Sequence, residues 1–177
     1  MDCVFLDYQK AFDTVPHQRL LTKLEACGVR GSIHGWIAAF LRNREQRVVV
    51  GGEMSSWTQV LSGVPQGSIL GPVLFLVYIN DVPVQVKSKV KLFADDTKLY
   101  NVIEKQEDRL TLQRDLCTLC EWSKNWQLKF NIDKCKSMHV GNREGDITNY
   151  YMTSEEGERI DLQVVTEGER LGGGCKK

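Results

Sequence analysis

The chain has 177 residues, a length that suits one domain with at most a small appendage. Apolar residues make up 42% and charged residues 26% of it, which excludes collagen, coiled-coil and wholly disordered proteins. Its 23 basic and 23 acidic side chains balance, which excludes a strongly basic nucleic-acid coat protein. A nucleic-acid enzyme is still allowed, because only its cleft needs to be positive.

The charges are unevenly distributed. Residues 1–140 carry 18 basic and 15 acidic side chains, whereas residues 141–177 carry 5 and 8. No apolar run reaches the roughly 18 residues of a membrane span, and Asp7 interrupts the apolar N-terminal stretch, unlike a signal peptide. We therefore expect no membrane association, a location in the cytoplasm or nucleus, and cysteines that are free thiols.

Apolar spacing predicts the main elements. A continuous apolar run at 3–6 predicts a buried strand that ends at Asp7. Helical periodicity predicts helices over about 16–27, 31–42, 68–80 and 106–124, and strands are predicted over about 2–7, 89–94 and 97–101. The last two strands form a hairpin with Asp95 and Asp96 at its tip.

Weaker patterns predict further strands. Two strands are expected at 48–50 and 57–61 around Gly51 and Gly52, and a strand pair is expected within 128–140. Beyond residue 140 the pattern weakens, so 141–177 is expected to be a weakly ordered acidic tail. Within it, 150–152 and 160–165 are candidates to pair as strands.

Three carboxylates are candidates for one site: Asp7 at the strand end, and Asp95 and Asp96 in the hairpin turn. Nucleotidyl transfer by two metals needs oxygen ligands on two Mg²⁺ ions about 3.5–4 Å apart. An Asp-Asp turn taken alone is more often a solvated turn, so the surrounding motifs decide between the two interpretations.

Three motifs follow one another along the chain: FLDYQKAFD at 5–13, SGVPQGSILGP at 62–72 and FADD at 93–96. A fourth, Asn131-x-x-Lys134, follows a helix that contains tryptophans. In this order they resemble the palm motifs of reverse transcriptases, specifically those of LINE-type (non-LTR) retrotransposons. The resemblance covers roughly residues 1–140.

The resemblance implies an α+β fold, a polymerase palm with a small antiparallel sheet backed by helices. It implies that Asp7 and Asp95 are the metal ligands, that Asp96 is the second acid of the hairpin, and that two Mg²⁺ ions, or Mn²⁺, are bound. It also implies that Lys134 neutralises or protonates the leaving pyrophosphate.

The same resemblance implies a nucleotide pocket. Phe12 matches the aromatic residue that blocks a ribose 2′-hydroxyl and so selects deoxynucleotides. Pro65, Gln66 and Gly67 match the turn that lies against the incoming nucleotide and the template base. Gly67 permits close backbone approach, and the Gln66 amide supplies both a donor and an acceptor.

The implied activity is RNA-directed DNA synthesis, with an RNA template, a DNA primer and deoxynucleoside triphosphates as partners. Compared with the family, a fingers region before Asp7 and a thumb after about residue 140 are missing from the sequence, so we expect a partial domain that needs both segments. The alternative is a catalytically inactive relic or an interaction module derived from the palm. A primer-extension assay separates these hypotheses.

One motif points elsewhere. Cys117-x-x-Cys120 with Cys135-x-x-x-His139 offers four ligands of the kind that hold tetrahedral zinc. Cys117 and Cys120 lie within the helical pattern beside core leucines, however, so packing as small apolar side chains is the preferred interpretation.

Overall fold

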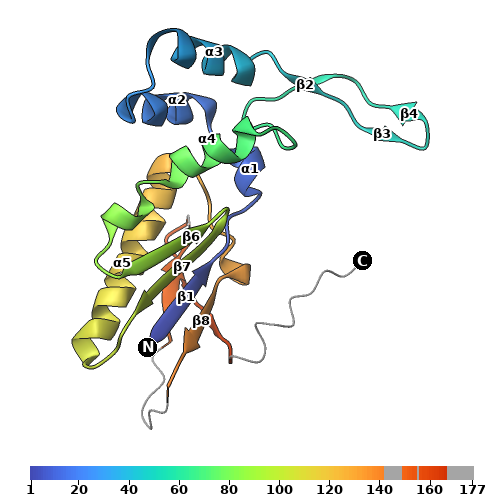
Figure 1. Cartoon of the computed structure of the whole chain (residues 1–177). Helices are drawn as coiled ribbons and strands as arrows, with labels where there is room; N and C mark the ends of the chain where they lie inside the picture. Colours follow the sequence, from blue (N-terminus) through green and yellow to red (C-terminus); the bar gives the residue numbers. More distant parts are fainter. Residues whose placement is uncertain (142–148, 155, 167–177) are drawn as a thin grey trace. The chain divides into compact units, whose positions relative to one another are not determined.

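The structure is a computed structural model that describes residues 1–141, 149–154 and 156–166 (Figure 1). Its contacts divide the chain into two units. We call Met1–Gln9 with Asp81–Lys177 the sheet unit, and Lys10–Asn80 the helical unit. Each unit is described by itself.

A five-stranded sheet organises the sheet unit. The strand order is β11-β8-β1-β7-β6, and every neighbouring pair is antiparallel except β8 with β11. The strands are β1 (Asp2–Leu6), β6 (Lys89–Phe93), β7 (Asp96–Asn101), β8 (Lys136–His139) and β11 (Gln163–Val164). The strand predicted to carry Asp7 is therefore central in the sheet, and the predicted hairpin pairs with it directly.

Helix α5 (Gln106–Trp126) lies on one side of this sheet and contacts β7 (Figure 1). Its Leu112, Leu116 and Leu119 are fully buried, as their helical spacing predicts. The helix begins where the Asp108 carboxylate accepts hydrogen bonds from the backbone N–H groups of Glu104 and Lys105 at 2.9 and 2.8 Å. It ends at Gln127, whose φ of 55° breaks the helical geometry.

The segment after β8 contributes further strands to the sheet unit. β9 (Tyr151–Thr153) pairs with β10 (Arg159–Asp161), which confirms the pairing expected there, and β11 joins β8. Tyr150 and Met152 are buried. The expectation of weak order falls largely on 142–148 and 167–177, which lie outside the described residues.

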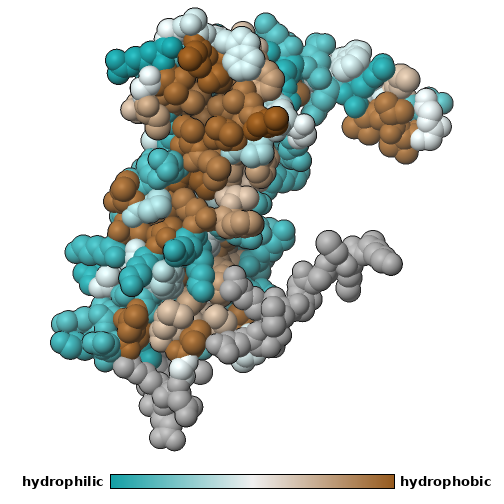
Figure 2. All heavy atoms as spheres, viewed as in Figure 1, coloured by the Kyte–Doolittle hydropathy of each residue, from teal (hydrophilic) through white to brown (hydrophobic). Residues whose placement is uncertain are grey.

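Four helices build the helical unit: α1 (Ala11–Thr14), α2 (His17–Ala26), α3 (Gly31–Leu41) and α4 (Leu70–Ile79). α2 contacts both α3 and α4, and the Lys23 ammonium, which is buried there, donates a hydrogen bond to the Tyr78 carbonyl oxygen. Exposed apolar side chains remain on α3 and α4, among them Ile33, Trp36, Val73 and Leu76 (Figure 2).

A long hairpin separates α3 from α4. The glycine turn is confirmed, but the strand that follows it begins earlier than predicted: β3 (Val49–Val50) pairs with β4 (Glu53–Met54) across Gly51 and Gly52. The predicted strand at 57–61 is represented by β5 (Thr58–Gln59), which pairs with β2 (Glu45–Gln46) further down the stem.

The chain is thus a mixed α/β protein with small antiparallel sheets, as the sequence predicts. One expected pairing is wrong: 128–140 does not fold back on itself as a strand pair. Only β8 forms there, preceded by the short 3₁₀ helix η2 (Ile132–Lys134), because Phe130 pairs with Tyr8 instead. Across the described residues no helix is long and apolar enough to cross a membrane.

Candidate active site

Asp7 follows directly on the last residue of β1, and the surrounding backbone holds it in place. Its carbonyl oxygen accepts a 2.8 Å hydrogen bond from the Asn131 N–H, and its own N–H donates to the Cys135 sulfur at 3.4 Å. The side chain is 38% exposed. The peptide is therefore fixed while the carboxylate can still be reached from solvent.

The segment that fixes Asp7 runs alongside it. The Gln9 N–H donates to the Lys129 carbonyl oxygen at 2.8 Å, and the rings of Tyr8 and Phe130 stack at 4.7 Å. Tyr8 is buried, and burial raises the pKa of its hydroxyl, so the ring enters the core as a neutral group. Residues 7–9 are thereby tied to 129–131 by two backbone hydrogen bonds and a stacked pair of rings.

The tip of the β6–β7 hairpin carries Asp95 and Asp96. Phe93 pairs with Asp96, which leaves Ala94 and Asp95 as a two-residue turn, and Ala94 has the positive φ (51°) common in such turns. Both carboxylates are exposed. Because Leu6 pairs with Thr97, continuing the register by one residue sets Asp7 opposite Asp96.

The charges around Asp7 oppose one another. Burial raises the pKa of the Asp7 carboxyl above its ordinary value, the Lys134 ammonium lowers it, and the negative charges of Asp95 and Asp96 add to the rise. Lys134, at the end of η2, places its Nζ 3.9 Å from Asp7 Oδ1. The net increase shows that burial, with the two negative charges, outweighs the charge of Lys134.

A bound divalent cation would favour the ionised form of Asp7, and carboxylate oxygens are the donors that Mg²⁺ prefers. The three side chains are not drawn together at ligating distance, since no group of three or more His, Cys, Asp or Glu side chains in the described part of the chain is arranged to hold a metal ion. The residues thus fit magnesium by donor chemistry, although the three carboxylates do not form a ready-made ligand group among the described residues.

The predicted nucleotide residues all lie in the helical unit. The Phe12 ring stacks on Phe75 of α4 at 4.7 Å, which fixes its orientation. The Gln66 side-chain amide donates a 2.9 Å hydrogen bond to the Asp13 carboxylate. Asp13 closes the first motif, so this bond links the first and second motifs within one unit.

The loop that carries Pro65, Gln66 and Gly67 is tightly packed against its surroundings. A Cβ added to Gly71 would lie 2.2 Å from the Pro65 carbonyl oxygen, and one added to Gly63, which has φ +88°, would lie 2.7 Å from the Asp13 carbonyl oxygen. Gly67 has φ +80° and is exposed. Glycine is therefore required at 63 and 71 for the loop to close.

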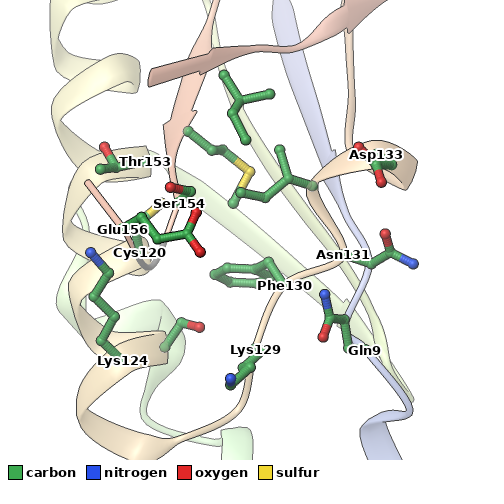
Figure 3. Close-up of a pocket in the computed structure, with 14 residues that line it drawn as sticks. Gln9, Cys120, Lys124, Lys129, Phe130, Asn131, Asp133, Thr153, Ser154 and Glu156 are labelled. Atoms are coloured by element: carbon green, nitrogen blue, oxygen red, sulfur yellow. The ribbon is translucent and has the colours of Figure 1, made fainter. Parts of the chain in front are cut away.

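A cavity of about 290 Å³ lies beside the segment that holds Asp7 (Figure 3). Phe130 lies at its centre, Lys124 and Lys129 reach its lower side, and Gln9 and Asn131 line the side next to β1. Its wall is therefore formed in part by residues whose backbones hold the Asp7 peptide.

Two residues of the candidate site, Cys135 and Asp13, were not predicted from the sequence to belong to it. The Cys135 thiol is buried against the Asp7 backbone, and burial raises its pKa to about 12, so it stays neutral. Asp13 closes the first motif in the sequence, but only the fold shows that its carboxylate accepts a hydrogen bond from Gln66. The sequence shows that Cys135 directly follows Lys134, but only the fold shows which peptide group the Cys135 thiol contacts.

The order of the motifs and the carboxylate register are those expected of a candidate nucleotidyl-transfer site. Residues 2–169 match the family described as reverse transcriptase (RNA-dependent DNA polymerase), and the chain belongs to this family.

Particular relatives come from mobile elements. The chain is 34% identical over 153 residues to the RNA-directed DNA polymerase from mobile element jockey of Drosophila melanogaster, covering 80% of this chain and 16% of that protein. It is 34% identical over 142 residues to the probable RNA-directed DNA polymerase from transposon BS of the same species (75% and 16%). It is 28% identical over 156 residues to a Pol polyprotein of the type-1 retrotransposable element R2 of Popillia japonica (80% and 25%). The chain thus spans between a sixth and a quarter of the length of these relatives.

Proposed function

We propose that this chain supplies the catalytic palm of an RNA-directed DNA polymerase of a non-LTR retrotransposon, with residues 1–140 as the palm and 141–177 as an appendage. The observation that carries the proposal is the site around Asp7. A fixed carboxylate stands in register with the Asp95–Asp96 turn, and burial and like charge together raise its pKa.

Asp7, Asp95 and Asp96 would hold two Mg²⁺ ions, which Mn²⁺ can replace. When bound, such ions lower the pKa of the attacking hydroxyl and neutralise charge on the triphosphate. The role of this chain is to hold the carboxylates in position for the ions. Strand β1 holds one of them and the two-residue turn holds the other two.

Lys134 acts on the leaving group. In the proposed reaction the primer 3′-hydroxyl loses its proton to solvent, and its oxygen bonds to the α-phosphorus while the bond from that phosphorus to the pyrophosphate oxygen breaks. The ammonium of Lys134, which pairs with Asp7 at 3.9 Å, neutralises or protonates the departing pyrophosphate.

Phe12 and the 65–67 turn select the substrate. We expect the Phe12 ring, which Phe75 holds by stacking, to leave no room for a ribose 2′-hydroxyl. Pro65, Gln66 and Gly67 would lie against the nucleotide and the template base, with Gln66 oriented by Asp13. The substrates are deoxynucleoside triphosphates, a DNA primer and an RNA template.

Primer extension on an RNA template with Mg²⁺ tests this function. The assay is run on the 177-residue chain and on a chimera in which its residues 2–169 replace the matching segment of the jockey polymerase. We expect Mg²⁺-dependent DNA synthesis by the chimera, and its loss in the Asp95→Asn variant. Glu121→Gln, which alters an exposed acid of α5, is the matched control and should keep the activity.

A folded chimera that binds primer and template but adds no nucleotide would favour the inactive relic. Synthesis that persists in the Asp95→Asn chimera would rule out the proposed site. A Phe12→Val chimera should accept ribonucleotides more readily than the unaltered chimera, and unchanged selectivity would remove Phe12 from the proposal.

A further inference from the structure

The cavity around Phe130 is formed where three segments of the sheet unit meet. Cys120, Ser123 and Lys124 contribute from the last turns of α5, at the spacing that places them on one face of the helix. The segment 129–133 returns from the end of α5 and forms the second wall. The β9–β10 hairpin closes the third side.

The centre of this cavity is apolar and aromatic. Phe130 lies in the middle (Figure 3), and its ring is held by stacking on Tyr8 at 4.7 Å. Met152, which is buried, pairs with Ile160 across the hairpin, and both line the cavity. A ring and a thioether side by side favour an aromatic guest.

The size of the cavity limits what can enter it. Its volume of about 290 Å³ lies at the lower end of the roughly 300–1,000 Å³ that is usual for small-molecule sites. It therefore suits one small molecule rather than a segment of a polymer.

Two lysines supply positive charge to the wall. Lys129 lies below the Phe130 ring beside Gln9 (Figure 3). Burial raises the pKa of the Cys120 thiol and the Lys124 ammonium lowers it, so this ammonium lies near the wall formed by α5. Both lysines are exposed, which lets a charged guest reach them from solvent.

Two acids also line the cavity, and their positions decide which charge a guest should carry. Glu156 lies above the Phe130 ring, on the opposite side from Lys129, and Asp133 lies beyond Asn131 on η2 (Figure 3). The lower part of the cavity is therefore the place where an anionic group would meet an ammonium and an amide with the acids at a distance.

We propose that this cavity binds one small aromatic carboxylate, with its ring against Phe130 and Met152 and its carboxylate beside Lys124 and Lys129. The site goes beyond the proposed function and does not depend on it. Its wall includes none of the residues proposed to hold metal or nucleotide.

NMR of the full 177-residue chain, with ¹³C-labelled methionine methyl groups and EDTA present, measures this binding. Of the four methionines, Met152 lines the cavity, whereas Met54 is exposed on β4 of the helical unit and serves as the internal control. The probes are indole-3-acetate and tryptamine, which share a ring and carry opposite charges. We expect indole-3-acetate to shift the Met152 signal saturably, to leave Met54 unmoved, and to bind about tenfold more tightly than tryptamine.

The variant Lys124→Gln/Lys129→Gln should weaken binding of indole-3-acetate by about tenfold and remove its advantage over tryptamine. The charge-preserving variant Lys124→Arg/Lys129→Arg should keep both. The matched control is Lys87→Gln/Lys89→Gln, which removes two exposed lysines of the sheet unit that do not line the cavity, and it should bind as wild type does.

The inference would be overturned by a Met152 signal that does not respond, by tryptamine binding as tightly as indole-3-acetate, or by an equal loss in the control pair. A parallel shift of Met54 would also overturn it, because binding would then be non-specific. EDTA removes metal, so this readout is independent of the carboxylates. If the cavity stays empty while Mn²⁺ binding depends on Asp95, the proposed function stands and the inference fails; the opposite pair of results leaves the cavity site and removes the metal site.

Discussion

Asp7 is held at its backbone by neutral partners while its carboxylate is left in an unfavourable environment. Asn131 and Cys135 satisfy the peptide, whereas burial and the charges of Asp95 and Asp96 act against ionisation of the side chain. Sites that perform chemistry often retain such groups at a cost in stability.

The variant Asp7→Asn should therefore be more stable than wild type at neutral pH when metal is absent. Burial raises the folded-state pKa of Asp7 above its ordinary value of 3.8. The protonated Asp7 side chain therefore stabilises the fold below pH 3.8, and this stabilisation is lost as the pH rises through the folded-state pKa. The gain from asparagine should accordingly vanish at low pH. Urea unfolding across this pH range measures it.

At saturating Mg²⁺ wild type should instead be more stable than Asp7→Asn, because an ion that binds only the folded protein stabilises wild type. Glu121→Gln is the control for removal of an exposed acid. A variant that is less stable than wild type at neutral pH without metal would contradict this description of Asp7.

Lys134 is the one cation that pairs with Asp7 among the ion pairs recorded in the described residues. Replacing it with alanine removes the charge that lowers the pKa of Asp7, so that pKa should rise further. The ¹³C chemical shift of the Asp7 side-chain carboxyl carbon, followed by NMR against pH, measures the change in this pKa. Lys87→Ala should leave the titration unchanged, and no difference between the two variants would mean that Lys134 does not act on Asp7.

At the scale of elements, the register of β1 decides where Asp7 points. Asp2, at the start of β1, is buried and binds groups from three other segments. Its carboxylate accepts a 2.7 Å hydrogen bond from the Tyr150 hydroxyl, pairs with His139 of β8 at 3.0 Å and lies 3.9 Å from Arg109 of α5. A slip by one residue would break all of these contacts and turn Asp7 to the other face.

Tyr150→Phe should lower the free energy of unfolding by about 2 kcal/mol, because a buried carboxylate loses a charge-assisted hydrogen bond. Tyr151→Phe changes the neighbouring, half-buried tyrosine and should cost much less. Thermal or urea unfolding compares them. Equal losses in the two variants would show that the Asp2 cluster does not hold β1.

The elements that follow simple periodicity were predictable from the sequence. α5, with its leucines at helical spacing, and the β6–β7 hairpin appear within a few residues of their expected bounds. The pairing of 128–130 was not predictable from the sequence. Phe130 forms a β-bridge and a stacked ring pair with Tyr8, which is distant in the chain, and local patterning contains no information about that contact.

The candidate site was predictable to a similar degree. Asp7, Asp95, Asp96 and Lys134 could be chosen from motif order, and the structure places Lys134 against Asp7. The thiol of Cys135 on the Asp7 peptide could not be predicted, since a buried cysteine has the same appearance in sequence whatever it contacts.

For the molecule as a whole, the match to the reverse transcriptase family extends from residue 2 to residue 169 and so includes both units and the strands β9 to β11. The three carboxylates and Lys134 belong to the sheet unit, whereas Phe12 and the 65–67 turn belong to the helical unit. We therefore expect metal binding to be a property of the sheet unit and nucleotide selection to be a property of the helical unit.

Binding of Mn²⁺ to the metal-free chain, measured by electron paramagnetic resonance with Mg²⁺ as competitor, tests the central claim most directly. We predict that the chain binds Mn²⁺, that Mg²⁺ displaces it, and that Asp7→Asn and Asp95→Asn each weaken binding by at least about tenfold, since changes even in outer-shell groups cost 10- to 100-fold. Glu121→Gln should bind as wild type does. Wild-type Mn²⁺ affinity in both the Asp7 and Asp95 variants would contradict the assignment of these carboxylates as metal ligands.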